Sequence, residues 1–386
     1  MYFFDTLLTG GLVIDPGQKI SKKANIGIIE PNFAEIVSPE EDSIETNIFR
    51  KKVFRKKIDV SGCYVVPGLI DFHTHIFRSG MVNAVDPEDL ISHGVIATVD
   101  AGSIGCLTFS HTRQTVMAHS LLKINAVLNY SVIGLLMLHD SEFDKPAFID
   151  ETELARTIDI HRDVVLGIKI RFSKGQLGQD CFDILEKAQK FARSNNVKLF
   201  IHSTNPPAPY PELLKRLDKG DILIHMYHGR GSTLLNEKGE VWPEAWAAQK
   251  RGIIFDCAHG MSHFNFDVAR KAIKQGFLPD IVSSDMTAFA FTFPQFKELP
   301  IVISELLTLG MTLEDIILRC TKIPASIMQG VISGIKVGYP ANLTVIKIEE
   351  GEFEFIDSEG QILNSSRRVV PQYTFINGRQ VYQRPE

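Results

Sequence analysis

Residues 65–75 read Val65-Val66-Pro67-Gly68-Leu69-Ile70-Asp71-Phe72-His73-Thr74-His75, and the prediction of the fold starts from this stretch. Its apolar part predicts a short buried strand, and the polar residues follow where that strand ends. Side chains two positions apart in a strand point the same way, so His73 and His75 should face one side and can chelate one metal ion. Two strand histidines on a polar face are the ordinary alternative, and the motif alone does not decide between them.

The middle of the chain repeats this pattern of a short apolar strand and a longer helical segment. Helical spacing is clearest in Phe182-Leu185-Ala188-Phe191-Ala192. Eight such strands within about 270 residues predict an α/β fold, a (β/α)8 or TIM-like barrel. A doubly wound sheet is the alternative, because strand count does not show closure. The predicted strands are Leu69–His73, Ile96–Asp100, Ile124–Asn129, Val165–Arg171, Leu199–His202, Ile222–His225, Ile253–Asp256 and Ile281–Ser284.

Both ends of the chain carry short apolar runs separated by turn residues. The C-terminal end includes Asn377-Gly378, which is typical of a hairpin turn. Segments at opposite ends can pair into one sheet if the middle folds as a closed unit. We therefore predict a small β-sandwich domain from residues 1–65 and 333–386, and a (β/α)8 barrel domain from residues 66–332.

Bulk composition excludes several classes of protein. A net charge of -5, with 44% hydrophobic and 23% charged residues, is ordinary for a globular protein and offers no basic field for nucleic acid. The five cysteines are scattered and form no CxxC pair, which favours a reducing compartment. The apolar tract 121–138 is interrupted by polar residues, and the first residues lack an export signal. We predict a cytoplasmic homo-oligomer that acts on a small molecule and binds neither a membrane nor nucleic acid.

Nearly every predicted strand ends in a polar or metal-binding residue, and barrel active sites are built at that end. Lys169 is unusual, because a lysine inside an apolar strand must pair with an acid, such as Asp100, or lose its proton. A neutral amine can add carbon dioxide and become an anionic carbamate. Asp285 would suit a cation, or alternatively cap a helix. The strand-end residues are His73, His75, Asp100, Asn129, Lys169, His202, His225, Asp256 and Asp285.

This set of residues resembles the amidohydrolase superfamily. The resemblance covers almost the whole chain and implies two divalent metal ions. By its pattern His73, His75 and Asp285 hold one ion, His202 and His225 hold the other, and a carboxylated Lys169 bridges them. Zinc is preferred, with manganese and iron left open. The stretches Cys63–Asp71 and Gly334–Leu343 resemble the family's entry to the first strand and its return to the small β domain.

Within the superfamily, residues 239–287 resemble the predicted deacetylase group long labelled dihydroorotase-like. Two departures bear on the pocket: Ala258 stands where glycine is usual, and His263 where a small hydroxyl residue is usual. True dihydroorotases carry an arginine two residues after the second histidine of the first strand, and here that residue is Phe77. They also carry a histidine shortly after the last aspartate, which this chain lacks.

The resemblance implies hydrolysis of an amide or ester bond of a small, carboxylate-bearing acyl compound by a metal-bridging hydroxide. Asp285 would be the catalytic residue that moves the proton. Arg171 lies two residues beyond Lys169 and is expected to bind the substrate carboxylate, with a surface ion pair as the alternative. His259 and His228 are further candidates for substrate contact. The competing functions are a cyclic-amide hydrolase of the dihydroorotase or dihydropyrimidinase type, and a scaffold that has lost its metals.

Overall fold

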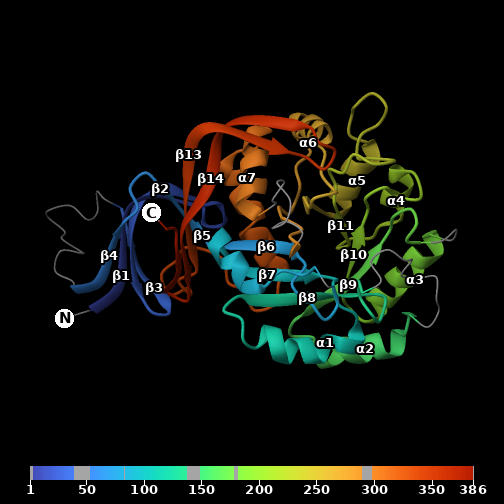
Figure 1. Ribbon diagram of the computed structural model, residues 1–386, viewed down its shortest axis with the longest axis horizontal. Helices are drawn as coiled ribbons and strands as arrows, with labels where there is room; N and C mark the ends of the chain where they lie inside the picture. Colours follow the sequence, from blue (N-terminus) through green and yellow to red (C-terminus); the bar gives the residue numbers. More distant parts are fainter. Residues whose placement is uncertain are drawn as a thin grey trace.

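The computed structural model describes residues 3–38, 53–81, 83–136, 148–177, 181–288 and 298–385. Two sheets organise these residues, one from strands near both ends of the chain and one from strands of the middle (Figure 1). No helix within the described ranges has the length and apolar character needed to cross a membrane.

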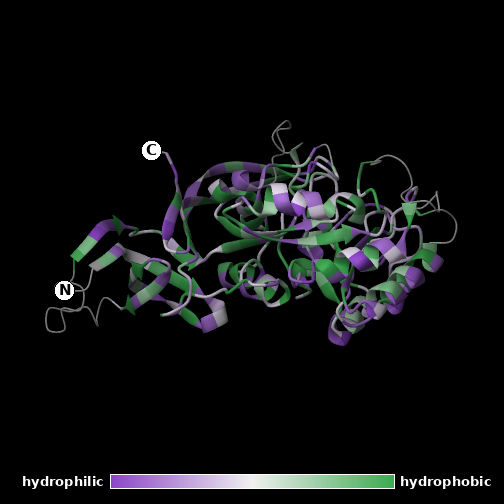
Figure 2. Cartoon of the chain, turned by 90° about the horizontal axis from the view of Figure 1, so that it is seen from below, coloured by the Kyte–Doolittle hydropathy of each residue, from purple (hydrophilic) through white to green (hydrophobic). Residues whose placement is uncertain are grey.

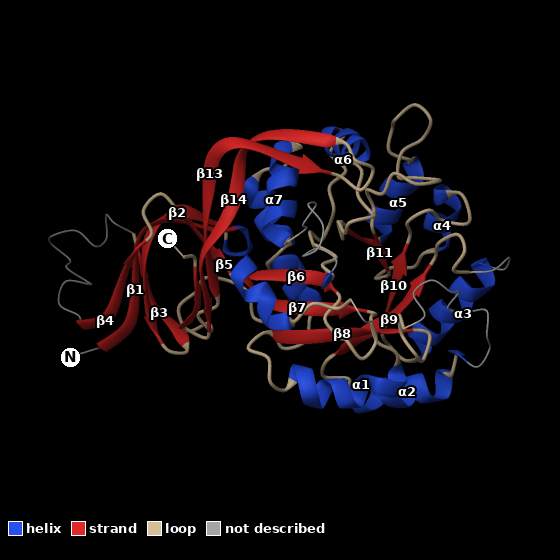
Figure 3. Ribbon diagram, viewed as in Figure 1, coloured by secondary structure: helices blue, strands red, loops and turns tan. Residues whose placement is uncertain are grey.

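The central sheet is parallel, and its seven strands follow one another in chain order (Figure 3). Most of their residues are buried, which is why they read as apolar runs rather than as alternating patterns. All seven agree with predicted strands to within a few residues. They are β6 (Leu69–Thr74), β7 (Val95–Ala101), β8 (Lys123–Asn129), β9 (Val165–Arg171), β10 (Lys198–His202), β11 (Ile222–Ile224) and β12 (Ile254–Asp256).

Residues 281–286 join the last strand of this sheet to the first. Ile281 forms a parallel bridge to β12, and Met286 forms one to β6. Between them Asp285 has a φ of 55°, in the left-handed region, and an extended strand does not continue through such a residue. The predicted strand Ile281–Ser284 is therefore present only as bridges. The resulting ring agrees with the predicted TIM-like barrel and not with a doubly wound sheet.

Helices cover the outside of the ring, and in α3 the side chains of Leu185, Ala188 and Ala192 are buried against it. Figure 2 shows hydrophobic residues along the central strands and hydrophilic ones on the outer helices. The helices are α1 (Cys106–Thr112), α2 (Glu151–Ile160), α3 (Cys181–Ser194), α4 (Tyr210–Arg216), α5 (Pro243–Arg251), α6 (Phe266–Lys274), α7 (Leu299–Thr308), α8 (Leu313–Arg319) and α9 (Lys322–Ile327). Helical segments of other types are η1 (Pro16–Gln18), η2 (Pro87–His93) and η3 (Arg113–Met117).

Strands from both ends of the chain form one mixed sheet of eight strands, ordered β15-β14-β13-β5-β1-β2-β3, with β4 paired to β1. Strand β5 pairs with β1 and with β13, and so joins the two ends. Because the hydrogen bonds unite all the described terminal strands in one sheet, the predicted sandwich of two sheets is not confirmed. The strands are β1 (Phe3–Asp15), β2 (Ile20–Ile29), β3 (Asn32–Val37), β4 (Val53–Asp59), β5 (Tyr64–Pro67), β13 (Leu343–Ile356), β14 (Ile362–Ile376) and β15 (Arg379–Gln383).

The long hairpin of β13 and β14 extends from the terminal sheet over the barrel, where it passes beside α7 (Figure 1). The backbone N–H of Val369 in β14 donates to Ser304 Oγ of α7 at 2.9 Å. At the hairpin tip, Phe264 N–H donates to Ser358 Oγ at 3.1 Å, and Ser358 N–H donates to the Phe264 carbonyl at 3.1 Å. The terminal sheet thereby fixes the loop between β12 and α6.

Candidate metal centre

The six side chains predicted to bind metal meet at the C-terminal end of the barrel. All are buried except His202, which is half-buried. Parallel strands present these ends at one rim, so residues far apart in sequence become neighbours. They are His73 in β6, His75 just after it, Lys169 in β9, His202 at the end of β10, His225 just after β11, and Asp285 in the closing segment.

We call His73, His75 and Asp285 side A of the centre. Asp285 Oδ1 lies 3.4 Å from His73 Nε2 and 3.2 Å from His75 Nε2, so the carboxylate faces both rings. Lys169 Nζ lies 3.3 Å from His73 Nε2, on the side that leads toward the remaining histidines. Two imidazole nitrogens and one carboxylate oxygen thus surround a single point.

We call His202, His225 and His263 side B. His225 Nε2 lies 2.9 Å from His202 Nδ1, and the ring of His263 lies 4.1 Å from that of His225. The ligand atoms of these three residues all lie within 4.8 Å of one another. The same spacing holds for His73, His225 and Asp285, so the two sides adjoin.

A hydrogen-bonded chain behind side A fixes the proton on His75. Ser103 Oγ donates its one hydrogen to Asp100 Oδ2 at 2.7 Å, and this carboxylate also accepts from the backbone N–H of Ile76 and Phe77. The Ser103 oxygen, 2.7 Å from His75 Nδ1, must therefore accept from that ring nitrogen. Nε2 of His75 is left with its lone pair facing Asp285, as a metal ligand requires.

A second buried carboxyl group, Asp256, stands behind His73. Asp256 Oδ2 lies 3.4 Å from His73 Nδ1, and Oδ1 accepts from Ser283 Oγ at 2.6 Å. Burial raises the pKa of Asp256 to about 8, against the lowering effect of the Ser283 hydrogen bond. Burial, assisted by the Lys169 ammonium, holds the pKa of His73 well below the usual imidazole range. A cation at this point would favour the ionised carboxylate and the neutral imidazole.

The support behind side B is a backbone carbonyl. His225 Nδ1 donates to the Ala258 carbonyl at 2.6 Å, which leaves the lone pair of Nε2 facing His202. Burial holds the pKa of both His202 and His225 well below the usual range, and neighbouring histidines add to the lowering. Both rings are neutral near pH 7, which is the form that binds metal ions.

Three residues of the centre have unusual backbone conformations. His225, Ala258 and Asp285 have φ angles of 65°, 36° and 55°, in the left-handed region that residues with a side chain rarely adopt. Each such residue costs on the order of 1–3 kcal/mol and persists where the surroundings impose it. The strain at Ala258 explains physically why glycine is usual at this position in the resembling group. From their left-handed positions, His225 and Asp285 both present ligand atoms to the centre.

Lys169 is held by close backbone packing. Gly102 has a φ of 85°, and a Cβ atom there would lie 2.7 Å from Lys169 Cδ. Only a glycine therefore lets the β7 loop lie against the methylene groups of the lysine. The packing directs the Lys169 amine toward the point between side A and side B.

A cavity of about 590 Å³ opens above the centre and is lined by residues of both sides. Three cations, Arg171, Lys174 and Arg230, line it together with the apolar side chains of Met81 and Leu135. It therefore combines candidate metal ligands, positive charge and an apolar wall, a combination typical of small-molecule sites.

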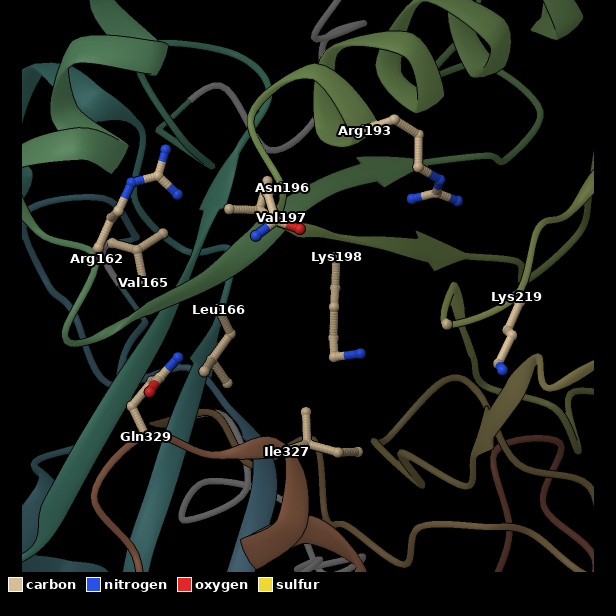
Figure 4. Close-up of a pocket in the computed structure, with 11 residues that line it drawn as sticks. Arg162, Val165, Leu166, Arg193, Asn196, Val197, Lys198, Lys219, Ile327 and Gln329 are labelled. Carbon is tan, nitrogen blue, oxygen red and sulfur yellow. The ribbon is translucent and has the colours of Figure 1, made fainter.

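A second cavity, of about 500 Å³, lies at the opposite end of the barrel (Figure 4). Its lining includes Lys198, Arg193, Lys219 and Gln329, near the starts of β10 and β11. None of the predicted metal ligands lines it, so the chemistry predicted for this fold belongs to the first cavity.

Of the three predicted substrate contacts, Arg171 lines the cavity, and His259 and His228 do not. Arg171 lines the cavity, as expected from its spacing to Lys169. His259 is fully buried, its Nε2 lies 2.7 Å from Glu305 Oε2 of α7, and it does not line the cavity. His228 is also fully buried, beside the ring of Tyr210, and lies outside the lining. The structure therefore places these two predicted contacts outside the cavity wall, and their role in binding substrate stays a prediction.

Sequence reasoning did not assign a role to His263, Lys174 or Arg230, which all line the cavity. His263 stands where the resembling group usually has a small hydroxyl residue, and that departure is the signal that the sequence carries. Lys174 and Arg230 lie on loops after β9 and β11, where the sequence carries no periodicity that predicts side-chain direction.

The donor set of the rim fits a pair of divalent cations. Neutral imidazoles with oriented lone pairs, a carboxylate and a lysine amine that can be carboxylated are nitrogen and oxygen ligands of the kind that zinc binds. The hydrogen bonds of His75 and His225 to groups behind them are the supports that metal-binding histidines usually have. The arrangement can thus hold cations beside the cavity.

A family model described as the amidohydrolase family matches residues 64–381. A deacetylase of Brucella anthropi is 29% identical over 329 residues, which cover 84% of this chain and 82% of that protein. Among solved structures, an adenine deaminase has a TM-score of 0.84 at 25% identity, covering 99% of this chain and 100% of the other. A dihydroorotase has a TM-score of 0.85 at 26% identity, covering 98% and 97%. These names refer to different reactions, so the choice of substrate depends on the cavity.

Proposed function

Because the chain belongs to the amidohydrolase family, whose members include hydrolases of carbon–nitrogen bonds, we propose that it is a metal-dependent deacetylase. Its substrate would be a small carboxylate-bearing compound with an amide-linked or ester-linked acyl group. The observation that carries the proposal is the meeting of side A, side B and Lys169 at one rim, beside a cavity with three cations.

The proposal gives each cation its own ligands. Side A would hold one, His202 and His225 would hold the other, and a carboxylated Lys169 would bridge the two. Zinc is the metal proposed, because imidazole and carboxylate ligands suit it. When bound, the two cations would activate a water molecule as nucleophile and polarise the acyl carbonyl. The neutral imidazoles and the Lys169–His73 distance of 3.3 Å support this assignment.

Asp285 is the residue proposed to move the proton. It lines the cavity, and its Oδ1 also faces Nε2 of His73 and His75. A carboxylate there can take the proton of the attacking water and deliver it to the departing amine or alcohol. Its backbone N–H donates to the His73 carbonyl at 2.8 Å, which ties the left-handed turn to β6 and fixes the direction of the carboxylate.

The cations of the cavity wall are proposed to bind the substrate carboxylate. Arg171, Lys174 and Arg230 line the same cavity as Asp285, and a guanidinium binds a carboxylate in a two-pronged manner. The apolar side chains of Met81 and Leu135 would contact the rest of the substrate. A volume of about 590 Å³ accommodates a compound of metabolite size.

The likeness to a dihydroorotase structure supports one alternative, a cyclic-amide hydrolase. At the position where that family carries a carboxylate-binding arginine, the side chain of Phe77 is fully buried and packs 6.4 Å from the ring of Phe109. The next residue, Arg78, is exposed and does not line the cavity. A metal-free scaffold is disfavoured, because all six residues of the superfamily pattern are present and converge.

The test combines metal analysis with an assay panel. Purified protein should contain about two divalent cations per chain. It should hydrolyse N-acetyl amino acids or acetylated hydroxy acids, and cyclic ureides should not be turned over. Activity confined to cyclic ureides would establish the alternative, and less than one cation per chain would favour the scaffold. An Arg171→Met variant should raise KM about 10–100-fold for carboxylate-bearing substrates, the loss expected for one charged hydrogen bond.

The same proposal places the enzyme in the cytoplasm as a homo-oligomer, on the basis of the sequence. Light scattering coupled to size-exclusion chromatography measures its mass directly. A species of about 43 kDa would show a monomer and overturn the oligomer.

A further inference from the structure

His263 lies in the loop between β12 and α6, and its ring packs against both histidines of side B. The ring centroids are 4.1 Å apart for His263 and His225, and 4.9 Å for His263 and His202. Its side chain is 22% exposed and contributes to the cavity wall. Ligand atoms of all three residues lie within 4.8 Å of one another. Three imidazoles therefore surround one point of the rim.

The hydrogen bonding of His263 leaves this ring available. Its Nδ1 is buried, and no described residue accepts or donates a hydrogen bond there. Its Nε2 lies 3.9 Å from Asp285 Oδ2, beyond hydrogen-bond distance. A buried polar atom without a partner is costly unless an ion or a water molecule satisfies it.

The loop that carries His263 is fixed from several directions. His259 N–H donates to the Ser283 carbonyl at 3.2 Å, and Gly260 N–H donates to the Ser284 carbonyl at 2.8 Å. Gly260 has a φ of 54°, and a Cβ there would collide with Asp285 Oδ2 and lie 3.0 Å from His263 Cδ2. On the other side, Phe264 is bonded to the tip of the β13–β14 hairpin. His263 is thus held against side B by both the barrel and the terminal sheet.

We infer that His263 is a third imidazole ligand of the side B cation, in addition to His202 and His225. This inference rests on the proposed function, because it assigns a ligand to one of the two proposed metal positions. Nitrogen ligands about 2.0–2.1 Å from a tetrahedral ion lie about 3.4 Å apart. The 2.9 Å between His202 Nδ1 and His225 Nε2 is near that value, and a ring nitrogen of His263 lies within 4.8 Å of both.

The consequence concerns Lys169. Two histidines alone provide too few ligands for a stable site, so the side B cation would otherwise depend on a carboxylated lysine. Three protein ligands with one open position are the arrangement of catalytic zinc sites. With His263 as ligand, side B retains a cation when Lys169 is a free amine. The chain therefore keeps both metals under low carbon dioxide.

The test is metal binding by the full-length protein, with His119→Ala, an exposed histidine outside the centre, as matched control. Apo protein is titrated with Co²⁺ while its visible absorption is recorded, and bound metal is counted by plasma mass spectrometry. Wild type and His119→Ala should bind two cations. His263→Ala should lose at least about tenfold in affinity for the second cation and change its absorption bands. His263→Asn serves as a second variant, and thermal melting verifies that both fold.

Two outcomes separate this inference from the proposed function. If His263→Ala and His263→Asn bind the second cation as tightly as wild type with unchanged absorption, His263 is not a ligand. A raised KM in these variants without a change in metal binding would also contradict the inference, because His263 would then be a substrate contact. Binding of no cation by the wild type would instead overturn the proposed function. Lys169→Ala adds a further measurement: it should retain the second cation, and Lys169→Ala/His263→Ala should lose it.

Discussion

Side A and side B supply imidazoles to the same cavity, but the groups behind them differ in kind. Behind side A stand two buried carboxyl groups, Asp100 through Ser103 and Asp256 directly. Behind side B, His225 donates to the Ala258 carbonyl, a neutral group. Carboxyl groups behind a histidine raise its basicity as a ligand and increase the electrostatic attraction for a cation. We expect side A to bind its cation more tightly and side B to exchange it more readily.

The difference shows how one rim can combine a fixed position with an adaptable one. Side A also contains the carboxylate of Asp285, which carries the proposed proton transfer. Side B is formed by three neutral rings, one of them on a loop held by the terminal sheet. Changes on side A should therefore affect catalysis most, and changes on side B should affect metal exchange.

The largest effect is expected for Asp285→Asn. The amide cannot accept the proton of the attacking water, so kcat should fall about 10³-fold. Steady-state hydrolysis of the best acyl substrate measures this. Asp183→Asn, an exposed acid of α3, is the matched control and should keep wild-type kcat. A loss below tenfold in Asp285→Asn would mean that another group moves the proton.

Ser103→Ala should weaken side A selectively. Without the hydroxyl the proton of His75 Nδ1 loses its acceptor, and such supports are worth about 10–100-fold in metal affinity. Competition with a chelator should show a lower affinity for one cation and an unchanged affinity for the other. Ser92→Ala, whose hydroxyl bonds to a local carbonyl, is the control. An equal loss of affinity for both cations would contradict a selective role of Ser103 at side A.

Gly102→Ala tests the packing of Lys169 between the two sides. The new methyl group would lie 2.7 Å from Lys169 Cδ at a φ of 85°, so strain and steric overlap add. We expect a loss of about 2–3 kcal/mol in the free energy of unfolding by urea. Gly62→Ala has a similar φ of 77° with nothing within 4 Å, and should lose only about 1 kcal/mol. Equal losses would show that Lys169 tolerates displacement.

The smallest effect is expected in the pH dependence of stability of the metal-free protein. A group adjacent to side B and a group behind side A should change the free energy of unfolding with pH in opposite directions. Burial lowers the pKa of His228, adjacent to side B, to about 3, so unfolding binds a proton and stability is lost as pH falls below 6.5. Burial raises the pKa of Asp256, behind side A, to about 8, so stability is lost as pH rises from 3.8 toward 8.

Urea unfolding at pH 5.5 and 6.5 separates these contributions. On going to pH 5.5, wild type should lose about 1 kcal/mol relative to His228→Gln, and gain about 1 kcal/mol relative to Asp256→Asn. Parallel pH profiles in wild type and both variants would show that neither group titrates differently on unfolding.

Much of the barrel could be predicted, because its strands are buried on both faces and read as apolar runs. The segment after Asp280 could not be predicted in detail, since the left-handed turn at Asp285 depends on contacts with β6. The convergence of the rim residues follows from chain order in a parallel sheet. The contact of His259 with Glu305 could not be predicted in this way, because α7 lies far from His259 in the sequence.

The sequence by itself determined the order of strands and helices and the presence of candidate metal ligands at strand ends, because these depend on local periodicity and residue chemistry. Tertiary structure alone decided which ring nitrogens face the centre, that His263 joins side B, and that the terminal sheet fixes its loop. These features arise from contacts between segments distant in sequence. Their geometry depends on how the whole chain packs, which no local pattern encodes.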